Sequence, residues 1–255
     1  MPFNQRKNHT LLILFILIIL FNASGSFAQK LSMAEAKHAG DSIIPEAILP
    51  FWQSLTLKEK VAQTLMVYMP SASYIKKHQF GGVLIMKPHL KDTLHLKEEL
   101  SLANESLKIP LLTAIDQEGG QVNRLQAISP EWKNLPSAKE MRTMTDDSVY
   151  NLAKQIGNEL HHYGINLNLA PVLDPPKDSK GKPSFIEVSN RSFGEFETAV
   201  PKIRSFVKGM KESKVLSTSK HFPGYDSWTN SDHQIAFSTS SKEIILRNVE
   251  LFKEF

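Results

Sequence analysis

The sequence predicts an α/β fold in which helices cover a parallel sheet, and three observations lead to this prediction. Short apolar runs of strand length alternate along the chain with amphipathic helical segments, as in strand–helix–strand units. Polar, chemically active residues follow several of these runs directly, where the strands of a barrel carry catalytic groups. No Gly-x-Gly-x-x-Gly sequence and no phosphate-binding loop occurs. Together these features favour a TIM-type (β/α)8 barrel over a doubly wound nucleotide-binding sheet.

Apolar runs of the length of buried strands mark the expected sheet. They are residues 65–69, 82–86, 111–115, 165–173 and 215–219. A full barrel has eight strands, and the sequence stops within an expected helix. The barrel is therefore expected to be incomplete in this chain, with about five strands present.

Helices are expected between and after these strands. Thr56 and Glu59 have the spacing of a capping box, and a charged segment over 91–106 separates the second and third strands. Two helices with a single apolar face follow. Their stripes are Val149, Leu152, Ala153, Ile156 and Leu160, then Ala199, Ile203, Phe206, Val207 and Met210. Ser240 and Glu243 are expected to cap a last helix. Its apolar residues are Ile244, Ile245, Val249 and Phe252.

Composition narrows the chemistry that the chain can perform. With 255 residues, 41% hydrophobic and 22% charged, it has the make-up of a globular protein with a core. The absence of cysteine excludes disulfides, thiolate metal sites and cysteine nucleophiles. The net charge of +4 is spread along the chain without a block of like charges, so no nucleic-acid partner is expected.

The N-terminus has the order of a secretory signal peptide. Arg6 and Lys7 precede an apolar run over 11–21, and small residues lead to Ala28. At about 1.5 Å per residue such a run spans only about half of a ~30 Å hydrocarbon core. We expect cleavage after Ala28, the alternatives being an uncleaved anchor or a buried helix. The mature chain, 29–255, is then one domain, periplasmic or secreted, with no stable membrane anchor.

Two groups of polar residues follow expected strands. Asp116 ends the third strand, and Arg124 comes after a double-glycine turn. A carboxylate can accept two sugar hydroxyls and a guanidinium donates in a planar fork, which suits carbohydrate binding. The alternative is a structural ion pair between the two. Asp116 with Glu118 would alternatively suit a substrate-assisted glycosidase.

The second group follows the fifth strand. Lys220 and His221 place a cation and an imidazole at the strand end, and the loop beyond carries Asp232 and His233. With a carboxylate beside it, His233 could serve as a general acid near neutral pH. The alternative is a histidine on the surface without a role. The spacing of His221 and His233 matches no known metal signature, and no metal is expected.

These motifs resemble glycoside hydrolase family 3, and more narrowly its β-N-acetylglucosaminidase branch. The motifs that carry the resemblance are Ile115-Asp116-Gln117-Glu118-Gly119-Gly120 with Arg124, Ala170-Pro171-Val172-Leu173-Asp174, Asn190-Arg191-Ser192-Phe193-Gly194, and Lys220-His221-Phe222-Pro223-Gly224 with His233. Residues 56–67 and 135–138 extend the resemblance over most of the expected mature chain. Four motifs in this order and spacing are specific.

The resemblance implies a TIM-type barrel and a retaining glycosidase that removes terminal β-linked N-acetylglucosamine, as in peptidoglycan fragments. In this family a carboxylate attacks the anomeric carbon, and a histidine on a long loop protonates the leaving oxygen. His233 matches that histidine. The positions that match sugar-binding residues are Asp116, Arg124, Arg191, Lys220 and His221. The implied partner is a carbohydrate substrate, and no metal or organic cofactor is implied.

The sequence departs from the family pattern at three places. The family pairs its loop histidine with an aspartate two residues earlier, where this chain has Ser231, and Asp232 lies next to the histidine instead. Gly224-Tyr225-Asp226 replaces the usual Gly-His-Gly. The nucleophilic aspartate is expected roughly 60 to 70 residues past the loop histidine, on a later strand and beyond Phe255.

Two interpretations follow from the third departure. The chain is the N-terminal part of a secreted hexosaminidase, as a gene fragment, or it is a sugar-binding remnant without catalytic activity. Both predict that these 255 residues alone do not hydrolyse the substrate. The remnant would leave an unpaired sheet edge, which invites aggregation.

Overall fold

The structure is a computed structural model that describes residues 44–238 and 240–255, so the expected signal peptide lies outside the described residues. The chain divides into two compact units, residues 1–56 and 57–255. In the first unit, helix α3 (Leu49–Ser54) begins with Pro50 in its first turn, where the missing N–H of proline costs no helical hydrogen bond. None of the described helices is long and apolar enough to cross a membrane.

The second unit is built on a sheet of five parallel strands in the order β1-β2-β3-β4-β5. The strands are β1 (Met66–Tyr68), β2 (Gly82–Ile85), β3 (Leu112–Ile115), β4 (Leu167–Asn168) and β5 (Leu216–Ser217). All five expected strands are therefore confirmed. Strand β4 is much shorter than the apolar run over 165–173, because only Leu167 and Asn168 pair with both β3 and β5. An open sheet of parallel strands agrees with an incomplete barrel.

Helices connect the strands, and most begin with a side-chain cap. Thr145 accepts a hydrogen bond from the Ser148 N–H at the start of α8, and Asp92 accepts one from the His95 N–H at the start of α6. The helices of this unit are α4 (Leu57–Gln63), α5 (Ala72–His78), α6 (Thr93–Asn104), α7 (Ala138–Met141), α8 (Asp146–His162), α9 (Phe185–Val188), α10 (Phe196–Glu212) and α11 (Lys242–Lys253). Short 3₁₀ turns are η2 (His89–Lys91), η3 (Leu125–Ala127) and η4 (Pro130–Trp132).

The expected cap of the last helix is wrong by one residue. Ser241, not Ser240, is the N-cap of α11, and its hydroxyl accepts a hydrogen bond from the Ile244 N–H. The hydroxyl of Ser240 instead donates to the buried carboxylate of Asp226. Two adjacent serines are equally suited to capping by residue type. Ser241 caps the helix because the hydroxyl of Ser240 is engaged by Asp226.

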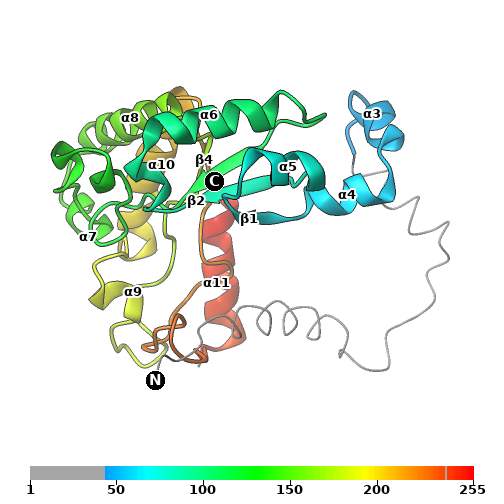
Figure 1. Ribbon diagram of the computed structural model, residues 1–255. Helices are drawn as coiled ribbons and strands as arrows, with labels where there is room; N and C mark the ends of the chain where they lie inside the picture. The colour runs from blue at the N-terminus through cyan, green and yellow to red at the C-terminus, as the bar shows by residue number, and fades with distance from the viewer. Residues whose placement is uncertain (1–43, 239) are drawn as a thin grey trace, which may run out of the picture. The chain divides into compact units, whose positions relative to one another are not determined.

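One face of the sheet packs against helices and forms the main core. Val83 and Ile85 of β2 and Ile115 of β3 point to this face and are fully buried. They belong to one apolar cluster with the stripes of α8 and α10, as the helical spacing predicts. Figure 1 shows α5, α6 and α8 on the same side of the sheet.

Helices α8 and α10 approach closely where each carries a glycine. A Cβ on Gly157 would lie 2.7 Å from the Ser213 Cβ. A Cβ on Gly209 would lie 2.5 Å from the Tyr150 carbonyl oxygen and 2.8 Å from the Lys154 nitrogen, both in the backbone of α8. This contact fixes the separation of the two helices that support the sheet.

Replacing Gly209 by alanine is therefore expected to destabilise the protein by about 1 to 3 kcal/mol. Alanine has the higher helix propensity, by roughly 1 kcal/mol, but its methyl group would force the backbones of α8 and α10 apart. Urea unfolding followed by circular dichroism measures the difference. Lys211→Ala, at an exposed position of the same helix, is the control and should leave stability nearly unchanged. Equal stability of Gly209→Ala and the wild type would contradict the close packing.

Candidate active site

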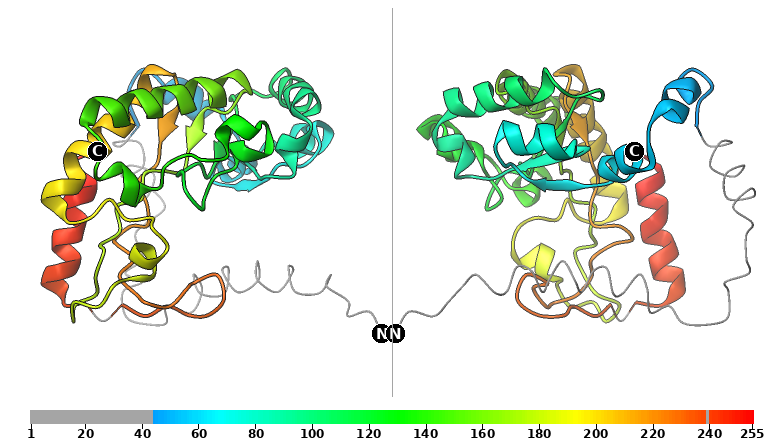
Figure 2. Two further views of the ribbon diagram at one scale, coloured as in Figure 1. Left: turned by 90° about the vertical axis from the view of Figure 1, so that its left-hand side faces the viewer. Right: turned by 45° about the vertical axis from the view of Figure 1, so that its right-hand side comes forward.

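Loops at the carboxyl ends of three strands bring the predicted polar residues together. Asp116 follows β3, Arg191 lies in the long connection after β4, and Lys220 follows β5. The connections after β4 and β5 lie side by side (Figure 2), joined by a hydrogen bond of 2.9 Å from the Phe185 N–H to the Ser227 carbonyl. They enclose a pocket of about 240 Å³. Its lining includes Asp116, Glu118, Arg124, Arg191, Lys220, His221, Tyr225, Asn230, Ser231 and Asp232.

Two acids and two cations form a connected network in this pocket. The Lys220 Nζ lies 2.6 Å from the Asp116 Oδ1 and 2.7 Å from the Glu118 Oε1. Arg191 donates to both oxygens of Glu118, over 2.8 Å and 2.9 Å, in the bidentate geometry that favours arginine–carboxylate pairs. Glu118 is the centre of the network, because it contacts both cations.

The network keeps Glu118 charged although this carboxylate is buried. Burial alone would raise the pKa of Glu118, but the hydrogen bond from Arg191 and the charges of Lys220 and Arg191 outweigh it and lower that pKa. Burial would likewise lower the pKa of Arg191, and the Glu118 carboxylate reverses this effect and raises it. Glu118 is therefore an anion at neutral pH and serves to hold the two cations in place.

Asp116 uses only one of its two carboxylate oxygens in this network. Its Oδ1 contacts Lys220, whereas its Oδ2 has no hydrogen bond within the described part of the chain. The Nε of Arg124 is also buried without a hydrogen-bond partner among these residues. The alternative of a structural ion pair between Asp116 and Arg124 does not hold, because the cation on Asp116 is Lys220. Both side chains line the pocket with unused hydrogen-bonding capacity.

Buried amides fix the strand end that carries Asp116. The side chain of Asn168 on β4 accepts from the Gln117 N–H at 3.0 Å and donates to the Gln117 carbonyl at 2.9 Å. The Gln117 side chain accepts hydrogen bonds from the backbone N–H groups of Arg124 and Leu125. The chain on both sides of the double-glycine turn is thus held by side chains that lie on the helix-covered side.

Asp174 anchors the start of the loop after β5. Its carboxylate is fully buried, and one oxygen accepts from the N–H groups of His221 and Tyr225, at 2.9 Å and 2.7 Å. The other oxygen lies 2.5 Å from the His221 Nδ1. This contact orients the imidazole and leaves its Nε2 directed away from Asp174, so His221 can contact a ligand in the pocket.

The loop after β5 places only some of the predicted catalytic residues at the pocket. Asp232 and Ser231 line the pocket, but His233 is exposed and is not among the lining residues. Within the described chain the side chains of Asp232 and His233 make no hydrogen bond to each other or to another group. The structure therefore brings together the predicted sugar-binding residues, whereas the roles of Asp232 and His233 stay predictions.

A buried carboxylate near the start of this loop forms hydrogen bonds with residues near its end. Asp226, only 3% exposed, accepts hydrogen bonds from the hydroxyls of Ser238, at 3.0 Å, and Ser240. The segment between them carries Ser231, Asp232 and His233. The resemblance to the family implies a glycine at this position, where the present sequence has a carboxylate.

Replacing Asp226 by alanine is expected to release the loop. Hydrogen bonds to a charged group contribute about 1.5 to 3 kcal/mol, and their loss should favour local opening by a similar amount. Limited proteolysis within 227–237 should then be faster than in the wild type, while the global unfolding midpoint changes little. Asp232→Ala is the matched control, because it removes an exposed carboxylate from the same loop that makes no side-chain hydrogen bond. Equal cleavage of Asp226→Ala and wild type would contradict this role.

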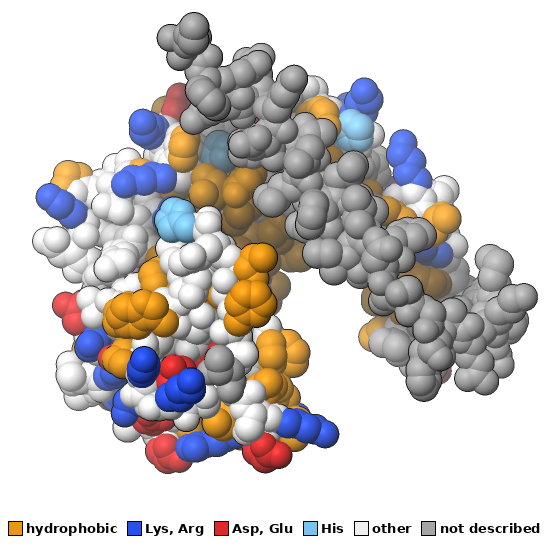
Figure 3. Space-filling view, turned by 90° about the horizontal axis from the view of Figure 1, so that it is seen from below, with side chains coloured by type: hydrophobic (Ala, Val, Ile, Leu, Met, Phe, Trp, Pro, Cys, Tyr) orange, Lys and Arg blue, Asp and Glu red, His pale blue; other side chains and the backbone are white. Residues whose placement is uncertain are grey.

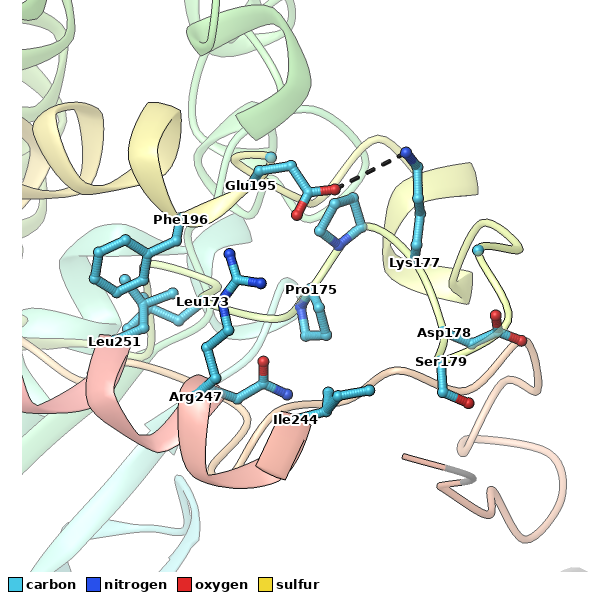
Figure 4. A pocket seen from close by; sticks show the side chains of 14 residues that line it. Leu173, Pro175, Lys177, Asp178, Ser179, Glu195, Phe196, Ile244, Arg247 and Leu251 are labelled. Atoms are coloured by element: carbon cyan, nitrogen blue, oxygen red, sulfur yellow. Dashed lines mark ion pairs between the residues drawn. The ribbon is translucent and has the colours of Figure 1, made fainter. Parts of the chain in front are cut away.

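A second cavity, of about 340 Å³, lies between α11 and the connection after β4 (Figure 4). Leu173, Phe196 and Leu251 form its apolar wall, and the Lys177 Nζ lies 3.9 Å from the Glu195 carboxylate at its rim. None of the predicted site residues lines it. In the described residues no group of three or more His, Asp or Glu is placed to hold a metal ion.

Comparison with known proteins identifies the family of the chain. A family profile described as the glycosyl hydrolase family 3 N terminal domain matches residues 56–253, which is most of the chain. The chain belongs to glycoside hydrolase family 3. This family 3 chain is 30% identical over 183 residues to a β-hexosaminidase of Actinobacillus pleuropneumoniae serotype 5b, covering 68% of this chain and 50% of that protein. It is 28% identical over 199 residues to β-hexosaminidase LpqI of Mycobacterium tuberculosis, covering 72% and 47%.

Solved structures of family 3 proteins show the same fold. LpqI of M. tuberculosis superposes with a TM-score of 0.68 at 26% identity, covering 81% of this chain and 60% of that one. A family 3 β-N-acetylglucosaminidase from Paenibacillus sp. FPU-7 superposes with a TM-score of 0.66 at 29% identity, covering 79% and 40%. The chain spans about half the length of the curated relatives it matches.

Proposed function

We propose that the pocket binds a terminal β-linked N-acetylglucosamine unit, and that the chain forms part of a retaining β-N-acetylhexosaminidase. One observation carries the proposal: Asp116, Arg124 and His221 converge at the sheet end with unused hydrogen-bonding groups. A free carboxylate oxygen and a guanidinium N–H match the hydroxyls of a sugar ring. The β-hexosaminidase relatives support the choice of an aminosugar.

The residues divide into those that touch the sugar and those that hold them. Asp116 would accept ring hydroxyls through its free oxygen, and Arg124 and His221 would donate to them. Lys220 and Arg191 are engaged by Glu118, so they act mainly by fixing Asp116 and the wall of the pocket. This division differs from the resemblance, in which Arg191 and Lys220 count as direct sugar contacts.

The chemical step requires an acid/base and a nucleophile. His233 would protonate the leaving oxygen and later activate water, after the loop brings it over the pocket. Ser231 or Asp232 would pair with its imidazole. The resemblance places the nucleophilic carboxylate on a later strand of the barrel, so residues 1–255 should bind the sugar without cleaving it. The same pocket would serve a sugar-binding remnant, which is the alternative function.

The site of action follows from the N-terminal sequence. Arg6 and Lys7 before an apolar run and a small-residue cleavage site support export, so we propose a periplasmic or secreted protein. Fragments of peptidoglycan, which carry β-linked N-acetylglucosamine, are the proposed substrates. Fractionation of cells that express the protein tests this localisation, and retention in the cytoplasm would contradict it.

Hydrolysis of a chromogenic β-N-acetylglucosaminide tests whether residues 1–255 bind the sugar and the later strands supply the nucleophile. The purified chain, shown to be folded by circular dichroism, should give no turnover above the buffer rate. A longer form of the protein that contains the later strands should be active on this substrate and much less active on the corresponding β-glucoside. Turnover by residues 29–255 alone would mean that another carboxylate of these residues is the nucleophile.

A further inference from the structure

Tyr225 contacts both the wall of the pocket at the sheet end and the loop after β5. Its ring lines the pocket beside two other rings. The ring centroid of Phe185 lies 6.5 Å away in an edge-to-face arrangement, and that of His221 lies 6.2 Å away. The backbone N–H of Tyr225 donates to the buried carboxylate of Asp174 at 2.7 Å. Neighbouring residues therefore fix both the backbone of Tyr225 and the direction of its ring.

The hydroxyl of Tyr225 reaches across the loop to Ser231. It accepts a hydrogen bond of 3.2 Å from the Ser231 backbone N–H. Ser231 belongs to a turn that Asn230 closes. The Asn230 carbonyl accepts a hydrogen bond of 3.2 Å from the His233 N–H, and its side chain accepts one of 2.9 Å from the Asp232 N–H. A contact at Ser231 therefore acts on the whole turn over 230–233, which carries the predicted acid/base.

Little apolar burial holds this loop in place. Its large hydrophobic side chains are mostly exposed, Trp228 at 63%, Phe237 at 74% and Ile235 at 77%. Hydrophobic side chains are visible among charged ones on the face of the molecule seen from below (Figure 3). A loop with few buried apolar contacts opens readily unless hydrogen bonds hold it. Asp226 supplies such bonds at the end of the loop, and Tyr225 supplies one at its turn.

The contact between Tyr225 and Ser231 requires a tyrosine. The usual Gly-His-Gly of the family reads Gly224-Tyr225-Asp226 in this chain. A phenol hydroxyl lies farther from the backbone than either nitrogen of an imidazole, and it accepts a hydrogen bond without a change of tautomer. The hydrogen bond to Ser231 is therefore a property of this sequence and does not follow from the family motif.

On the basis of the function proposed above, we propose that Tyr225 is a positioning residue for the reaction. Its hydroxyl holds the turn over 230–233 beside the pocket, and its ring forms part of the wall against which the sugar lies. A general acid has to lie within hydrogen-bond reach of the oxygen that it protonates. The hydroxyl of Tyr225 therefore contributes to the placement of His233, whereas its ring contributes to binding of the sugar.

Amide hydrogen exchange of the purified chain, followed by NMR, tests the loop contact without a sugar. Tyr225→Phe keeps the ring and removes the acceptor of the Ser231 N–H. This amide should then exchange about two- to tenfold faster than in the wild type, as expected for the loss of one hydrogen bond. Tyr150→Phe is the matched control, because it removes a hydroxyl that bonds to Glu212 and lines no part of the pocket. An unchanged Ser231 amide in Tyr225→Phe would overturn the proposal.

The affinity for N-acetylglucosamine separates the role of the ring from that of the hydroxyl. In calorimetric titration, Tyr225→Phe should bind the sugar within about twofold of the wild type, whereas Tyr225→Ala, which lacks the wall, should bind about tenfold more weakly. Equal losses in the two variants would show that the hydroxyl contacts the sugar and would overturn the positioning role. If the wild type binds no sugar, the proposed function fails, and the exchange measurement shows separately whether the loop contact exists.

Kinetics of a form that contains the later strands provide a readout that a purely structural role would not move. Tyr225→Phe should lower kcat by about tenfold, because a displaced His233 transfers its proton less efficiently, and should leave KM within about twofold of the wild type. A raised KM with an unchanged kcat would overturn the proposal, because it would show that the hydroxyl of Tyr225 binds the substrate and does not position the acid.

Discussion

Replacing Glu118 by alanine is expected to lower the free energy of unfolding by about 3 to 5 kcal/mol, because it removes the buried carboxylate that pairs with two partly buried cations. Arg191 loses both of its hydrogen bonds to this carboxylate, and Lys220 keeps only Asp116. Urea unfolding followed by tryptophan fluorescence measures the loss. Glu212→Ala is the control, because Glu212 pairs with Lys154 at the surface with 40% of its side chain exposed. There the free energy of unfolding should change little, because an ion pair at the surface contributes little to stability.

The same substitution should show a defined pH dependence. The pKa of Glu118 in the folded protein lies below its ordinary value of 4.5, so its contribution is fully present above that value. The contribution is lost as the pH falls through the lowered pKa, because the folded protein must then take up the proton. The stability difference between wild type and Glu118→Ala should therefore be constant near neutral pH and shrink below about pH 4.5. A constant difference down to the acid range would contradict an ionised Glu118.

Replacing His233 by alanine is expected to slow release of N-acetylglucosamine by about 10² to 10⁴-fold in a form of the enzyme that contains the later strands. The histidine would donate the proton to the leaving oxygen, so the loss should appear in kcat and should be smaller for substrates with an acidic leaving group. Steady-state kinetics on substrates with good and poor leaving groups measure both effects.

His161→Ala provides the control, since His161 is exposed on α8 and lines no part of the pocket. An unchanged rate for His233→Ala would remove this residue from the mechanism. The variants Asp232→Asn and Ser231→Asp identify the partner of the imidazole. If Asp232 fills this role, its replacement should shift the alkaline limb of the pH–rate profile to lower pH, because an adjacent anion favours the imidazolium.

The long elements of the fold could be predicted because their periodicity is strong. The stripes of α8 and α10 are buried as expected, and the five apolar runs all contain strands. Helices α5, α7 and α9 were not predicted, because seven or four residues carry too little periodicity to separate a helix from a loop. Ser240 and Ser241 suited the cap of α11 equally, and only the tertiary contact with Asp226 separates them.

The pocket could be predicted in part, because residues after parallel strands meet at one end of the sheet. This rule brought Asp116 and Lys220 together, and their contact is present. The rule does not say which carboxylate binds which cation, so the central position of Glu118 and the anchoring role of Asp174 were missed. A second acid only two residues after Asp116 was the sequence feature that could have indicated the role of Glu118. The position of His233 depends on a long loop that no periodic pattern describes.

The measurement that tests the central claim most directly is calorimetric titration of the folded chain with N-acetylglucosamine, with glucose as the comparison sugar. The proposal predicts saturable 1:1 binding that is stronger than for glucose and that falls by about tenfold or more in Asp116→Asn, which removes a charged hydrogen-bond acceptor. Absence of binding by a folded wild-type chain, or equal binding by Asp116→Asn, would contradict an aminosugar site at the end of this sheet.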